Sequence, residues 1–292
     1  MSSRTSQYLL TAIIAVAATL AVQMIQRNPL SPPAVTSLGS QTAYDQVVKN
    51  NTLRCSYVVS SPHTIKDPNT GKLSGIMYDI TEEAAKRLGL KVDWVEEVTW
   101  ATYFTGLQFG RYDAFCGAGF SLEQEIKNAE LVGPAFYAGI TAWVRPDDHR
   151  FDADVHMINA PDVKISAIDG SIGSVLAREE FPNASVLSAP STSDYTFNPL
   201  NVANHKADVT FLENQIAYEY LEKNPGTLRG IGLDRPLHAY PVVLLVNKGE
   251  FKLQSLLDGV VKQMAVDGAV DGILKKYEKA PKAYYRVAKP YQ

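Results

Sequence analysis

The 292-residue sequence has little net charge and no excess of basic residues, with 28 Lys and Arg against 31 Asp and Glu and a formal charge of -3. Proteins that bind nucleic acid usually carry a basic excess that neutralises phosphates, so no nucleic-acid partner is expected. With 46% hydrophobic and 20% charged residues, the composition is that of an ordinary globular protein of one or two domains.

The motifs of common catalytic and metal sites are also missing. The sequence contains no Gly-x-Ser-x-Gly motif and no paired Cys/His arrangement. The five histidines, which show no metal-ligand spacing, are His63, His149, His156, His205 and His238. We therefore expect no metal, no cofactor and no enzymatic activity.

An apolar run without charges occupies residues 8–25. It is long for the core of a signal peptide and barely long enough to cross a bilayer, which takes about 20 residues. Residues 1–27 are therefore expected to be either a signal anchor in the inner membrane or a signal peptide cleaved after residues 19–21, and both alternatives export the remainder. No cysteine follows the run, which excludes lipid attachment at that point. The proline-containing residues 28–42 are expected to be a linker.

The most informative stretch, residues 99–137, predicts a helix, a tight turn, a buried strand, a glycine-rich loop and a second helix. The strand is expected at residues 111–116 and the loop at residues 117–119, where backbone N–H groups would be uncovered. Ser121 and Gln124 have the spacing of a capping box that opens the second helix. Since open α/β sheets bind ligands at the carboxyl ends of their strands, this loop is the first candidate for a site.

Strands alternate with helices in two successive parts of the chain, which predicts an α/β fold with a mainly parallel sheet. Arg111-Tyr-Asp113 and Lys206-Ala-Asp208 both lead into a strand, as two lobes of similar construction would. Residues 145–148, a proline-acid cluster after an apolar strand, are a candidate hinge. The other strands are expected at 53–59, 90–94, 140–144, 163–168, near 186, 208–212 and 237–246, and an amphipathic helix is expected at 253–264.

These residues resemble the bacterial extracellular solute-binding proteins of family 3, the polar amino acid binders of ABC importers. The matching motifs are Leu53 to Tyr57, Gly71 to Asp79, Leu107 to Asp113, Gly133-Pro134, Lys248 to Glu250 and Asp267-Gly268. The resemblance implies a two-lobed periplasmic-binding-protein fold of type II, in which each lobe is a mainly parallel sheet flanked by helices. The chain would cross twice between the lobes, with residues 43–144 and 240–292 in lobe 1 and residues 145–239 in lobe 2.

The resemblance also implies a ligand site, which this sequence keeps only in part. The flanking aromatic residue is kept as Trp100, whereas the arginine that pairs with an α-carboxylate maps to Glu125, or to Gln124 if the alignment slips by one. The acid that takes an α-amino group is kept as Glu213. The candidate ligand-binding residues are Tyr57, Ser60, His63, Trp100, Gly117, Ala118, Phe120, Glu125, Ser171, Ile172 and Glu213.

An acid in place of that arginine reverses the sign of the interaction with a carboxylate, so a neutral or cationic ligand is favoured over a plain α-amino acid. Glu125 could instead simply stabilise the start of a helix, and Trp100 could belong to the core. We expect an exported protein that captures a small polar molecule, amino-acid-like, an amine or a polyol, for the permease of an ABC importer by hinge closure. The alternatives are a periplasmic sensor or adaptor with a protein partner, and a lyase in which Glu125, Glu213 or His63 acts as acid or base.

Cys55 and Cys116 fall on strands one and three, which are neighbours in the usual strand order of such a sheet. Export and an even cysteine count favour a disulfide, but adjacent parallel strands hold a pair in awkward geometry. A disulfide and two buried thiols both remain open.

Overall fold

The computed structural model describes residues 41–280 and 282–288. The described helices and strands belong to one compact unit, Thr42–Gln292, which is called here the second unit. The predicted signal segment at residues 1–27 and residues 28–40 of the predicted linker lie outside the described residues. Among the helices of the described residues, none is long and apolar enough to cross a membrane.

A 10-stranded sheet with the strand order β4-β1-β5-β11-β6-β9-β7-β8 organises the second unit. Its first three strands are mutually parallel and are called here the β1 half, namely β4 (Lys91–Glu97), β1 (Thr52–Tyr57) and β5 (Ala114–Phe120). Its last three strands are also parallel and are called the β7 half, namely β9 (Val209–Glu213), β7 (Lys164–Ile168) and β8 (Ser185–Ala189). The predicted α/β class with parallel strands in each lobe is confirmed.

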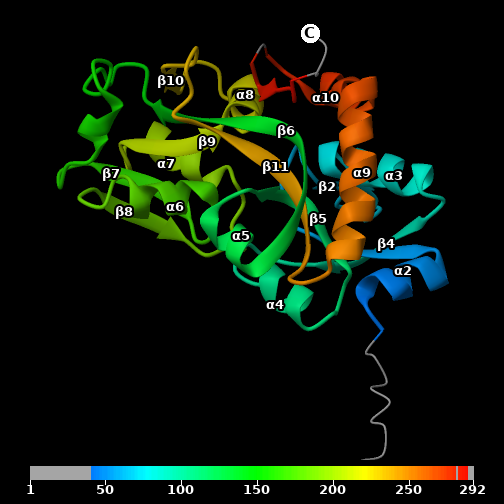
Figure 1. The fold of residues 1–292 in the computed structure, drawn as a ribbon. Coiled ribbons are helices and arrows are strands. Elements are labelled where there is room, and N and C mark those ends of the chain that lie inside the picture. Colours follow the sequence, from blue (N-terminus) through cyan, green and yellow to red (C-terminus); the bar gives the residue numbers. More distant parts are fainter. Residues whose placement is uncertain (1–40, 281, 289–292) are drawn as a thin grey trace, which may run out of the picture. The chain divides into compact units, whose positions relative to one another are not determined.

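Two long antiparallel strands, β6 (Ala129–Val144) and β11 (His238–Asn247), connect the two halves and run beside each other through the middle of the sheet (Figure 1). The short strands β10 (Arg229–Ile231) and β12 (Tyr284–Tyr285) pair with β6, and β2 (Ile65–Lys66) pairs with β3 (Leu73–Ser74). The central pairs are antiparallel because the chain enters and leaves the β7 half along these two strands.

Helices cover the sheet through apolar stripes. The predicted apolar stripe of α9 (Phe251–Asp267) is buried at five of its six positions, which confirms the amphipathic helix, while Leu256 is half-buried. The buried residues are Leu253, Leu257, Val260, Val261 and Met264. The remaining helices are α2 (Ala43–Asn50), α3 (Ile76–Arg87), α4 (Tyr103–Gln108), α5 (Glu123–Asn128), the 3-10 helix η1 (Val155–Ile158), α6 (Ile172–Glu179), α7 (Phe197–Ala203), α8 (Asn214–Lys223) and α10 (Ala269–Tyr277).

The stretch from residue 99 to residue 137 differs from its prediction in three places. The expected loop at residues 117–119 is part of β5, where Gly119 pairs with Val243 of β11. A Cβ on Gly119 would lie 3.0 Å from the carbonyl oxygen of Val243, so this glycine serves close strand packing rather than a loop. The helix expected from Thr99 begins only at Tyr103, and α5 begins after Leu122 without a side-chain cap, so the predicted capping box is wrong.

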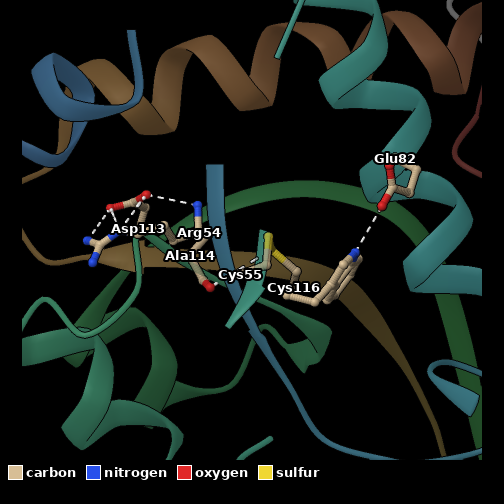
Figure 2. The surroundings of a disulfide bond; sticks show 7 residues. Arg54, Cys55, Glu82, Asp113, Ala114 and Cys116 are labelled. Atoms are coloured by element: carbon tan, nitrogen blue, oxygen red, sulfur yellow. Dashed lines mark hydrogen bonds and ion pairs between the residues drawn. A yellow bond between two sulfur atoms is a disulfide. The ribbon is translucent and has the colours of Figure 1, made fainter. Parts of the chain in front are cut away.

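Cys55 and Cys116 form a disulfide in the core of the β1 half (Figure 2). Cys55 is in register with Ala114, so Cys116 lies two residues further along the neighbouring strand and on the same face. This diagonal placement gives a Cα–Cα distance of 5.6 Å, inside the usual range of about 4.4–6.8 Å. The expected awkwardness of a parallel pair is avoided because the cysteines are not directly opposite each other.

In each half, an aspartate that directly precedes one strand accepts a hydrogen bond from the backbone of the neighbouring strand. In the β1 half, buried Asp113 accepts a hydrogen bond from the backbone N–H of Arg54 at 2.9 Å and pairs with its guanidinium at 2.7 Å (Figure 2). In the β7 half, Asp208 accepts a hydrogen bond from the backbone N–H of Lys164 at 2.9 Å. The two halves therefore share a structural device that the repeated basic-x-Asp pattern had indicated.

Candidate functional site

A cavity of about 370 Å³ lies between the β1 half and the β7 half, next to the carboxyl end of β5. From the β1 half it is lined by Trp100, Phe120 and residues 123–126 of α5, and from the β7 half by residues along the whole of α6 and by Tyr195. Ligand sites in α/β folds occupy this kind of position, where parallel strands end and helices begin. The cavity is therefore the candidate binding site.

Glu125 is the one carboxylate of this cavity that is buried, with only 6% of its surface exposed. Its Oε1 accepts a hydrogen bond from the hydroxyl of Tyr103 at 2.6 Å. Its Oε2 is buried and has no hydrogen-bond partner among the described residues. Burial raises the pKa of the Glu125 carboxyl, and the Tyr103 hydroxyl partly offsets that effect. A buried acceptor of this kind suits a donor supplied by a ligand.

Aromatic rings form much of the remaining wall. Trp100 meets Tyr103 edge to face at 6.4 Å, and Phe120 lies 5.8 Å from the ring of Tyr240. Burial raises the pKa of the Tyr240 hydroxyl to about 12, so it remains a hydrogen-bond donor at neutral pH. The faces of such rings attract cations as well as apolar groups.

The other charged residues of the cavity lie in more exposed positions. Glu123 is paired with Lys127 at 3.4 Å, and its side chain is 90% exposed. Arg178 is paired with Glu179 at 3.5 Å, and their side chains are 67% and 63% exposed. The cavity therefore has an acidic interior and a mixed, solvated rim.

A second group of predicted site residues joins the two halves directly. His63 follows β1 and Glu213 ends β9, and His63 Nε2 lies 2.7 Å from Glu213 Oε2 with both side chains buried. The backbone carbonyl of His63 accepts a hydrogen bond from Met77 in α3 at 2.8 Å. A Cβ at Gly75, whose φ is +121°, would lie 2.5 Å from the same carbonyl oxygen, so glycine is required for this approach. Glu213 is thus paired with a protein side chain.

Tyr195, which the sequence did not single out, belongs to the walls of two cavities. It lines the cavity of Glu125 and also a second one of about 280 Å³, which is bordered by Ser60, Lys66 and Glu219. Burial and the nearby charge of Glu213 raise the pKa of the Tyr195 hydroxyl, whereas hydrogen bonding with Ser60 and Trp100 opposes the rise. The residue precedes α7 in a region where no element was predicted, so no periodic signal could reveal it.

The structure gathers some of the predicted site residues and disperses others. Those that line the cavity of Glu125 are Trp100, Phe120, Glu125 itself and Ile172, while Ser60 lines the second cavity. The remaining predicted residues line neither cavity. Tyr57 packs on Trp94, and Ser171 is buried. Gly117 and Ala118 lie within β5, and His63 and Glu213 form a pair. Sequence reasoning missed Tyr103, Arg178 and Tyr240, which lie on helices or strands whose patterns indicated only packing, and Tyr195, which lies outside the helices and strands. Over residues 41–280 and 282–288, no group of three or more His, Cys, Asp and Glu side chains could hold a metal ion.

Comparison with known proteins agrees with this architecture. The chain is 28% identical over 218 residues to the ABC transporter glutamine-binding protein GlnH of Bacillus subtilis, which covers 74% of this chain and 76% of that protein. It is 46% identical over 52 residues to the L-cystine-binding protein TcyA of the same organism, which covers 18% of this chain and 19% of that protein.

Solved structures with the same fold include the ancestral amino acid-binding protein AncCDT-1, a precursor of cyclohexadienyl dehydratase, with a TM-score of 0.71, 25% identity, and coverage of 82% of this chain and 100% of that one. The solute receptor for L-cysteine of Neisseria gonorrhoeae has a TM-score of 0.71 at 17% identity and covers 84% of this chain and 100% of that one. Residues 54–280 match the sequence profile of the bacterial extracellular solute-binding proteins, family 3, and the chain therefore belongs to that family.

Proposed function

We propose that this protein captures a small polar molecule in the cavity of Glu125 and delivers it to the permease of an ABC-type importer. The observation that carries the proposal is the cavity itself, which is lined by residues of both halves at the carboxyl end of β5. Trp100, Phe120, Glu125 and Ile172 are the predicted site residues that contact the ligand in this proposal. Family membership supports a transport role and an extracellular or periplasmic location.

The binding movement is a hinge closure in which the β7 half approaches the β1 half. The lobes correspond to residues 43–144 with 240–292 and to residues 145–239, so β6 and β11 are the two connections that bend. Arg145, at the start of the candidate hinge, donates hydrogen bonds to the carbonyl oxygens of Val202 and Ala207, which fixes it to the β7 half. Bending would then fall on the strands just before it.

Export is part of the proposal, through a signal peptide or an inner-membrane anchor at residues 8–25. The disulfide between Cys55 and Cys116 supports an oxidising compartment, because such bonds rarely persist in the cytosol.

Small-angle scattering with a panel of amines, amino acids and polyols tests the proposal. A ligand that raises the melting temperature should also reduce the radius of gyration and should be recovered unchanged. Recovery of a converted product would instead identify a lyase, and the absence of closure with every compound would contradict a transport role.

A further inference from the structure

The buried carboxylate of Glu125 is only partly hydrogen-bonded within the described part of the chain. Tyr103 satisfies Oε1, but Oε2 is left without a hydrogen-bond partner among the described residues, and Glu125 is one of the residues that line the cavity. An unsatisfied buried acceptor is costly, and more so when it is ionised. A ligand with an N–H group at that point would remove the cost, and a positive charge on the ligand would remove more of it.

The aromatic lining favours a cation independently of Glu125. Trp100, Tyr103, Phe120, Tyr195 and Tyr240 all contribute to the wall of the cavity. Aromatic faces stabilise ammonium groups and also bury the apolar chain that carries them. A polyol would gain less from this wall because it would have to leave its hydroxyl groups against hydrocarbon.

The same cavity offers little to a carboxylate. Among the residues that line it, Arg178 is the only lysine or arginine, and it sits at the exposed rim beside Glu179. The acid Glu213, which would take the amino group of an amino acid in the way the family resemblance implies, is already paired with His63. The interior of the cavity therefore carries a negatively charged group, whereas an α-carboxylate would need a positively charged one.

We infer that the cavity binds an aliphatic ammonium ion that carries N–H groups and lacks an α-carboxylate, with Glu125 Oε2 accepting a hydrogen bond from its nitrogen. The inference rests on the proposed function and specifies its substrate class. A quaternary ammonium would satisfy the aromatic rings but not the buried acceptor, so it is the weaker ligand.

Binding of this kind is coupled to a proton. Burial raises the pKa of Glu125 in the free protein, and an adjacent ammonium ion favours the ionised form. Binding therefore releases a proton and becomes tighter as the pH rises through the raised pKa. Tyr103 from α4, Arg178 and Glu179 from α6, Tyr195, and Tyr240 from β11 are the other titratable groups that line the cavity, with Glu123 on the same helix as Glu125.

Isothermal titration of the purified chain tests this with ligand pairs that differ only in the carboxylate. We expect 1,5-diaminopentane to bind at least 10-fold more tightly than L-lysine, agmatine to bind more tightly than L-arginine, and trimethylation of both nitrogens of the diamine to weaken its binding. Repetition in buffers of different ionisation enthalpy should reveal proton release. Equal or tighter binding of the amino acids, or no binding of any amine, would overturn the inference.

Variants locate the effect at Glu125. Glu125→Gln should weaken diamine binding by about 10- to 150-fold, the usual contribution of a charge-assisted hydrogen bond, and should abolish proton release. The matched control Glu222→Gln removes an acid of α8 that pairs with Lys279 on the surface, and should bind normally. Tyr103→Phe should shift the pH profile of binding to higher pH, which a purely structural role would not do. Closure with another compound, together with failure of these tests, would leave the transport proposal standing and refute only the amine assignment.

Discussion

Removal of the Cys55–Cys116 disulfide should destabilise the protein by an amount set by the length of chain it closes. The two cysteines are 61 residues apart, and the loop entropy lost from the unfolded state corresponds to about 4 kcal/mol. The closed segment contains α3, β4 and α4, so the bond restricts most of the β1 half. For a chain of this size, the loss should lower the melting temperature by about 8–16 °C.

Guanidinium unfolding of the oxidised and the reduced protein measures this with no change of sequence. The midpoint should fall on reduction, and the denaturant dependence should increase because the reduced unfolded chain exposes more surface. The double variant Cys55→Ala/Cys116→Ala should lose at least as much, since both side chains are fully buried. A difference below about 1 kcal/mol between the oxidised and reduced proteins would refute the loop-entropy reasoning.

Three further predictions concern single residues. His63→Ala leaves buried Glu213 without its partner and should cost about 3–5 kcal/mol in denaturant unfolding; an unchanged midpoint would show that the pair contributes nothing. Tyr195→Ala should join the two cavities and lengthen the α,ω-diamine that binds best by titration, whereas an unchanged preference would place the wall elsewhere. Arg150 lowers the pKa of Asp148, so the stability from this pair is present above the ordinary pKa of an aspartate and is lost as the pH falls through the lowered pKa. Asp148→Asn should therefore flatten the acid side of the plot of melting temperature against pH. A plot that runs parallel to that of the unchanged protein would contradict this.

Elements with a strong apolar period could be predicted from sequence because burial imposes that period. The helix expected at residues 253–264 exists as α9, and the basic-x-Asp pattern marks equivalent contacts of Asp113 and Asp208 in the two halves. Such features depend on local spacing, which the sequence contains in full.

The prediction of a loop at residues 117–119 was wrong because contacts with a strand far away in the sequence decide the structure there. Glycine permits exposed loops and also permits close strand packing, and only the approach of Val243 in β11 decides between these uses. The helix α7 was missed because its sequence, Phe-Asn-Pro-Leu-Asn-Val-Ala, lacks an extended amphipathic repeat.

The candidate site was only partly predictable for a related reason. The resemblance implied that Glu125 or Gln124 stands in place of a carboxylate-binding arginine, but the burial of Glu125 and its bond to Tyr103 depend on how α4 packs beside α5. Likewise, Glu213 was identified as an acid at the end of a strand, while its pairing with His63 depends on contact between residues far apart in sequence.

In the proposed function, Tyr195 would give this protein a means of changing its ligand preference in one mutational step. Its side chain lines both cavities between the halves, of about 370 and 280 Å³, and it belongs neither to the sheet nor to the helix that carries Glu125. A smaller residue there would extend the accessible length without altering the charge at the acidic end. In the proposed function, ligand length and ligand charge would thus be set by different residues, and each could be selected or engineered without disturbing the other.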